Sequence, residues 1–118
     1  MSKKDSIVLL EDILDSIEQI QKYVLGLDFD KFENNRLVID AVVRNLEIIG
    51  EASKLLTEDF RRKYTNIPWV KIIATRNKVI HEYGSVNLEI VWGIIEKELP
   101  RLKDEFTALL IEIKRNAK

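Results

Sequence analysis

The chain has 118 residues, of which 46% are hydrophobic and 33% charged, with a formal net charge of −1 and no cysteine. This length suits one domain, residues 1–118, with a single core, and the apolar fraction excludes intrinsic disorder. The lack of cysteine excludes disulfides and thiolate metal sites and fits a cytoplasmic protein, and one histidine does not supply a zinc site. No apolar run approaches the ~20 residues of a membrane span, and the near-neutral charge gives no general attraction to nucleic acid.

The first predicted element is a long helix. Apolar residues recur at helical spacing from about Ser6 to Leu25, and Gly26 suits the position after the last turn. A linking turn with the sequence LDFDKFENN is expected next. One stripe of the helix should face the core, and it consists of Leu10, Ile13, Leu14, Ile17, Ile20 and Val24.

A second long helix is predicted from about Arg36 to Leu56. Its charged residues fall on one narrow stripe, which consists of Asp40, Arg44, Glu47, Glu51 and Lys54. Nearly all other positions are apolar or small, so the apolar arc is wider than a helix on the outside of a bundle needs. We therefore expect burial on two sides, against its own core and against a second copy in a homodimer. The alternative is a central helix surrounded by its own chain.

The middle of the chain should hold a short helix and a longer one. Thr57 begins the short helix, which continues through EDFRRKY. Pro68 suits the first turn of the next helix, which is predicted to run to about Tyr83 and to end at Gly84.

The last helix is predicted from a cap at Asn87 to about Lys114. Pro100 should kink this helix without ending it, because the apolar face continues in phase on both sides. That face consists of Val91, Trp92, Ile95, Leu99, Leu102, Phe106, Leu109 and Ile113. The predicted fold is all-α, an antiparallel bundle of four long helices plus one short helix.

Arg76 breaks the pattern, because it lies in the middle of the apolar arc of the helix that begins at Pro68. Asn77 and His81, four residues apart, share a face at the border of that arc. One explanation is an internal ion pair between Arg76 and Glu47 or Glu51 on the second helix. The other is a phosphate site, in which the guanidinium binds oxyanions and the imidazole moves a proton near neutral pH.

Basic residues offer a candidate surface for RNA. Arg61, Arg62 and Lys63 form the run RRKY with Tyr64, and Lys71, Arg76 and Lys78 follow on the next helix. The alternative is that the run is only the solvated end of a helix.

The segment RNKVIHEY, from Arg76 to Tyr83, matches an R-x4-H-x-Y signature. Here the sequence resembles the HepT-like toxins, a branch of the HEPN superfamily of helical RNA-cleaving domains. Further segments resemble the family in the family's order: LEDILDSIEQIQKYVLGLDFDKF, AVVRNLEIIGEASKLL, IPWVKIIATRNKVIHEY and LEIVWGIIEKELPRL. One departure is Asn87, where relatives commonly carry aspartate, and either residue caps a helix.

The resemblance implies a homodimeric, metal-independent endoribonuclease that acts as the toxin of a toxin–antitoxin pair and needs no cofactor. Arg76 and His81 would be catalytic, and Asn77 a supporting polar group. The antitoxin would be a minimal nucleotidyltransferase that transfers AMP from ATP onto Tyr83, which neutralises the toxin. RNA would be the substrate, with 2′,3′-cyclic phosphate products.

The chemistry agrees with this interpretation, because metal-free RNA cleavage needs a base, an acid and a cation for the phosphorane charge. One histidine per chain falls short of that set, and a two-fold cleft with both copies of Arg76 and His81 would complete it. A non-catalytic module that binds a nucleotide or the nucleotidyltransferase is the alternative function. A purely structural helical dimer is the third interpretation.

Overall fold

The computed structural model describes residues 1–81 and 86–116, with the backbone alone for 79–81. These parts of the chain are helical and contain no strand, as predicted. In chain order the elements are α1 (Lys3–Tyr23), α2 (Phe29–Glu33), α3 (Arg36–Leu55), α4 (Glu58–Lys63), α5 (Trp69–His81), α6 (Leu88–Gly93), the π-helix η1 (Ile94–Glu98) and α7 (Leu99–Arg115). None of the described helices is long and apolar enough to cross a membrane.

Two boundaries near the amino terminus differ from the prediction. The first helix begins at Lys3 and not near Ser6, because the Ser2 side chain accepts a hydrogen bond from the backbone N–H of Asp5 and caps it. The predicted turn after Gly26 contains α2, which begins where the Asp28 side chain accepts from the N–H of Lys31. Sequence periodicity misses a helix this short because it spans little more than one turn. Gly26 itself has a positive φ of 80°, which suits glycine.

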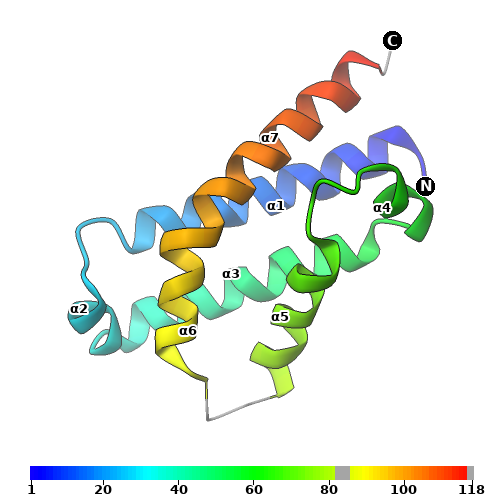
Figure 1. Cartoon of the computed structure of the whole chain (residues 1–118). Helices are drawn as coiled ribbons and strands as arrows, with labels where there is room; N and C mark the ends of the chain where they lie inside the picture. Colours follow the sequence, from blue (N-terminus) through cyan, green and yellow to red (C-terminus); the bar gives the residue numbers. More distant parts are fainter. Residues whose placement is uncertain (82–85, 117–118) are drawn as a thin grey trace.

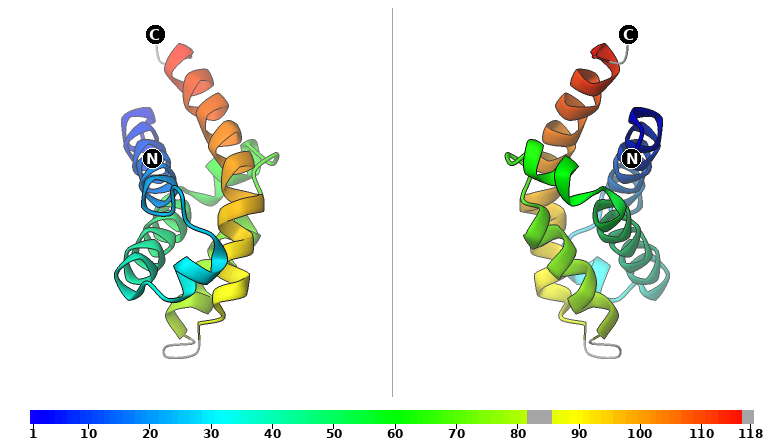
Figure 2. Two further views of the ribbon diagram at one scale, coloured as in Figure 1. Left: turned by 90° about the vertical axis from the view of Figure 1, so that its left-hand side faces the viewer. Right: turned by 90° about the vertical axis from the view of Figure 1, so that its right-hand side faces the viewer.

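The helices form two layers around one core. Helices α1 and α3 run side by side in opposite directions, α7 lies against α1, and α5 packs on α3 (Figure 1). Figure 2 shows α1 and α3 on one side of the molecule and α5 with α6 and α7 on the other. The core joins these layers through Ile13, Ile17, Ile20, Val42, Leu46, Ile49, Trp69, Ile72, Leu99, Leu102 and Phe106. This arrangement confirms the predicted all-α bundle.

The last long helix is continuous but irregular. The η1 segment precedes Pro100, and the N–H of Leu99 donates to the carbonyl of Ile94, five residues back. Proline crowds the carbonyl of residue i−4 and donates no hydrogen bond, so the wider π-turn accommodates its ring. The chain changes direction at η1 (Figure 1). The predicted kink at Pro100 is therefore confirmed, and the apolar face stays in phase from Val91 to Ile113.

Helix α3 obtains part of its two-sided burial within its own chain. Its core positions face α1, and another side packs against α5. Large apolar side chains nevertheless stay exposed at its ends, where Leu37 is 81% exposed and Leu55 is 66% exposed. The alternative of a central helix surrounded by its own chain thus explains much of the wide apolar arc, but leaves these two residues uncovered.

Candidate active site

Helix α5 carries the candidate site, and its first turn is anchored firmly. The indole N–H of Trp69 donates to the carbonyl of Tyr64 at 2.9 Å, and the ring packs edge-on against Phe106 at 5.7 Å. Trp69 and Ile72 are buried, as the helical projection predicts. Because Arg76 lies one turn beyond Ile72, the same face carries the guanidinium into the contact between α5 and α3.

The Arg76 side chain is only 20% exposed and is held from two directions. Its Nη2 donates to Oε1 of Glu51 on α3 at 3.2 Å, and its Nη1 donates to Oδ1 of Asn77 at 2.9 Å. Its Nε is buried and has no hydrogen-bond partner among the described residues. The predicted ion pair therefore exists, and of the two candidate carboxylates Glu51 makes it. Glu47 pairs instead with Arg44 at 3.6 Å on its own helix.

Gly50 explains how Arg76 reaches this position, and sequence reasoning missed its role. A Cβ atom built on Gly50 would lie 2.0 Å from the Cβ of Arg76 and 2.5 Å from its Cγ. Only glycine lets α3 and α5 approach so closely at this point. The available signal was a glycine in the interior of a long apolar helix, next to an acidic residue, Glu51.

His81 ends the described part of α5. The backbone is helical up to this residue, so His81 lies one turn after Asn77 on the same face of the helix, as predicted. Its side chain, like the whole of Tyr83 and the predicted helix end at Gly84, lies outside the described residues. The structure thus brings Arg76, Asn77 and the backbone of His81 to one end of α5.

The candidate RNA-binding residues divide between the two ends of α5. Arg61, Arg62 and Lys63 lie on α4, near the first turn of α5 and away from the other end of that helix (Figure 1). Arg62 is already paired with Glu58 at 3.1 Å and with a second carboxylate, so this run is not a purely basic surface. Lys78 is exposed on α5, one turn before His81, and is the one of these four basic candidates that lies within the R-x4-H segment.

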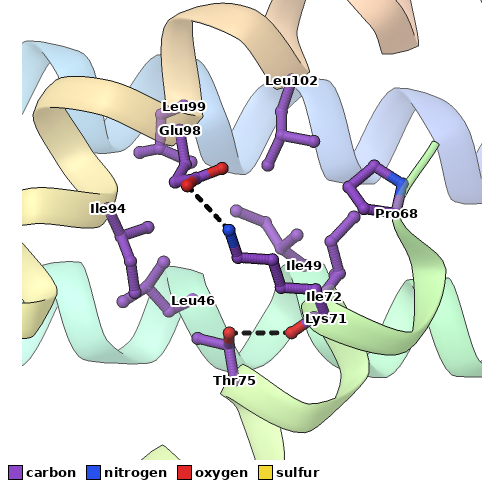
Figure 3. Close-up of a pocket in the computed structure, with 10 residues that line it drawn as sticks. All are labelled: Leu46, Ile49, Pro68, Lys71, Ile72, Thr75, Ile94, Glu98, Leu99 and Leu102. Carbon is purple, nitrogen blue, oxygen red and sulfur yellow. Dashed lines mark hydrogen bonds and ion pairs between the residues drawn. The ribbon is translucent and has the colours of Figure 1, made fainter. Parts of the chain in front are cut away.

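A groove runs along α5 on the side that faces η1 and α7. One pocket, of about 40 Å³, has Leu46, Ile49 and Ile72 among its lining residues, and Lys71 reaches across it to Glu98 (Figure 3). A second pocket, of about 60 Å³, includes Lys78 and Asn87. Pockets that hold small molecules measure about 300–1,000 Å³, so neither accommodates a nucleotide.

A chain of ion pairs runs from Lys71 through Glu98 to Arg101, and its first two members line the first pocket. Glu98 accepts from Nζ of Lys71 at 2.8 Å and from Nη2 of Arg101 at 2.6 Å. The hydrogen bond from Lys71, against a smaller opposing effect of burial, lowers the pKa of Glu98 below its usual value. Lys71 therefore connects α5 to η1 and does not extend the basic surface. Within residues 1–81 and 86–116, no group of three or more metal-ligating side chains gathers at one place.

The helical bundle, with Arg76 and His81 five residues apart on α5, is consistent with the HEPN-like fold that the resemblance implied. The comparison with protein families is more specific: the model of the Ribonuclease HepT-like family matches residues 13–109. The chain belongs to the HepT-like ribonuclease family.

Three curated relatives match over nearly their full length. The chain is 39% identical to "Putative RNase MJ1380" of Methanocaldococcus jannaschii over 105 residues, which cover 89% of this chain and 96% of the relative. It is 43% identical to "Putative RNase TTE0752" of Caldanaerobacter subterraneus over 101 residues, 86% of this chain and 90% of the relative. It is 39% identical to "Probable ribonuclease HepT" of Thermococcus cleftensis over 100 residues, 85% and 91% of the two chains. No solved structure gives a significant match.

Proposed function

We propose that this protein is a metal-independent endoribonuclease in the cytoplasm, the toxin of a toxin–antitoxin pair, with Arg76 and His81 as its catalytic residues. The observation that carries the proposal is the placement of Arg76, a guanidinium in the apolar face of α5 with two polar partners, on the helix that also carries His81. The family match and the relatives named as ribonucleases support the reaction class.

The reaction would use the 2′-hydroxyl of the RNA as nucleophile. His81 of one subunit takes the 2′-proton while the 2′-oxygen attacks phosphorus, and the bond from phosphorus to the 5′-oxygen breaks. His81 of a second subunit donates a proton to the leaving 5′-oxygen, so a 2′,3′-cyclic phosphate and a 5′-hydroxyl result. Arg76 stabilises the charge on the phosphorane oxygens, and Lys78 attracts the RNA backbone. A homodimer that joins two α5 ends supplies both histidines.

Neutralisation would occur by AMPylation of Tyr83. A partner nucleotidyltransferase would transfer AMP from ATP to the phenol oxygen and release pyrophosphate. Tyr83 is two residues from His81 in the sequence, so the adduct would bring bulk and negative charge to the position where an RNA phosphate binds.

One observation favours a second candidate, a non-catalytic module that binds a nucleotide or the nucleotidyltransferase. Arg76 already has a carboxylate partner, Glu51, within its own chain. In that case Arg76 and Glu51 would serve the fold and the binding surface, and no RNA would be cleaved.

Cleavage of end-labelled RNA in EDTA distinguishes the two functions. The wild-type protein, shown by intact mass to carry no AMP on Tyr83, should cut RNA to 2′,3′-cyclic phosphate ends. His81→Ala from a matched preparation should lose at least ~100-fold in rate, the usual share of a general acid or base. Equal cutting by both proteins would indicate a contaminant or another site. No cutting by unmodified dimer across several RNA classes would favour the binding module.

A further inference from the structure

Glu51 on α3 has a side chain that reaches Arg76, a candidate catalytic residue. Its Oε1 lies 3.2 Å from Nη2 of Arg76, and the carboxylate is 49% exposed while the guanidinium is 20% exposed. The pair thus lies at the rim of the α3–α5 contact, with the arginine on the inner side. An ion pair that is exposed to this degree adds little to folding stability. Burial of Arg76 accounts for its having a partner, and the exposed side of the pair leaves room for a second role toward a ligand.

The stem and the head of Arg76 are held by different residues. Its Cβ and Cγ lie against the backbone at Gly50, where no other side chain would fit. The helix contact therefore determines where the side chain leaves α5, but an arginine head still rotates about its remaining bonds. Glu51 and Asn77 each accept from a different terminal nitrogen, which defines the plane of the guanidinium.

This arrangement leaves hydrogen-bond donors for a ligand. A guanidinium carries five N–H groups, two on each terminal nitrogen. Among the described contacts, one N–H of Nη1 and one of Nη2 are used, so a second N–H on each remains. Two terminal N–H groups in one plane are the donors that bind two oxygens of a phosphate side by side.

We propose that Glu51 is a positioning residue for RNA cleavage: from α3 it orients the Arg76 guanidinium on α5 so that the free terminal N–H groups meet the phosphate. This inference rests on the proposed ribonuclease function. Without Glu51, only Asn77 on α5 itself would hold the Arg76 guanidinium, and part of this orientation would be lost. Because small displacements of a catalytic group cost large factors in rate, the role of Glu51 should appear mainly in kcat.

Glu47 provides a matched control. It lies on the same helix one turn earlier, and its partner Arg44 is on α3 itself. Glu51→Gln and Glu47→Gln remove the same charge from the same helix. Any effect of net charge on RNA affinity or on solubility is therefore common to both variants.

The experiment measures kcat and KM for end-labelled RNA in EDTA for the wild type, Glu51→Gln, Glu51→Asp and Glu47→Gln, beside thermal unfolding of each. Glu51→Gln should lower kcat by about 10–100-fold with little change in KM or in the unfolding temperature. Glu51→Asp should recover part of the rate, and Glu47→Gln should match the wild type. Proton–nitrogen NMR of the Arg76 Nε group supplies a second measurement that needs no activity, and its signal should move in Glu51→Gln but not in Glu47→Gln.

Distinct results overturn the two proposals. If the wild type cleaves, His81→Ala does not, and Glu51→Gln cleaves like the wild type, the ribonuclease stands and the positioning role is wrong. If Glu51→Gln and Glu51→Asp lose activity only in proportion to lost thermal stability, the pair is structural and the positioning role is again wrong. If the wild type cleaves no RNA while the Nε signal still moves, the ion pair exists but the proposed function and the inference built on it both fail.

Discussion

Substitution of Gly50 by alanine tests the close contact between α3 and α5. The added Cβ would lie 2.0 Å from the Cβ of Arg76, more than 1 Å inside the 3.4 Å at which ordinary contact begins. Both atoms are next to helix backbone, so the helices themselves must separate. Overpacking of this kind costs about 1–3 kcal/mol, and the upper end applies because no flexible side-chain tip can move aside. The gain in helix propensity, about 1 kcal/mol, offsets only part of this cost.

The expected result is a net loss of about 1–2 kcal/mol in the free energy of unfolding, measured by urea denaturation. This corresponds to a fall of ~4 °C in the unfolding temperature per kcal/mol for a domain of this size. Gly93→Ala is the matched control, because Gly93 has helical angles and no described atom within 4 Å of the added Cβ. Gly93→Ala should instead stabilise the protein by about 0.5–1 kcal/mol.

A double mutant isolates the contact. Arg76→Gly removes both atoms that collide with the new Cβ, so Gly50→Ala should cost less in an Arg76→Gly background than in the wild type. The reasoning is refuted if Gly50→Ala leaves the free energy of unfolding unchanged or raises it as Gly93→Ala does.

Two further changes test the core and the ion-pair chain. Phe106→Ala should lower the free energy of unfolding by about 3–5 kcal/mol, because the ring is fully buried against Trp69; a loss below 1 kcal/mol in urea denaturation would contradict this packing. Glu98→Gln should cost up to about 1 kcal/mol at neutral pH, because it removes the charge that Lys71 and Arg101 bind. Since its pKa is lowered when folded, the stabilisation by Glu98 is complete above the ordinary value of 4.5 and is lost as the pH falls through the folded-state value. Thermal unfolding of wild type and variant should therefore converge in acid, and a constant difference would contradict the assignment.

Much of the fold could be predicted from local sequence, because helix formation depends on spacing and capping within a few residues. The helical period predicts the buried stripe from Leu10 to Ile20 and the buried face from Val91 to Ile113, in which only Leu14 and Trp92 are partly exposed. Asn87 caps the last helix by accepting from two backbone N–H groups, and Thr57 caps the short one. The anomaly at Arg76 was also visible, since a guanidinium on an apolar face needs a partner.

The sequence by itself determined that this chain is a helical bundle, which faces of its helices are apolar, and that Arg76 needs an anionic partner. Only the tertiary structure decided that Glu51 and not Glu47 is that partner. Both carboxylates lie on the charged stripe of α3, and the choice depends on where α5 crosses it. The crossing is possible because Gly50 lacks a side chain, and the fit of one helix against another depends on distances in space that no local pattern of residues contains.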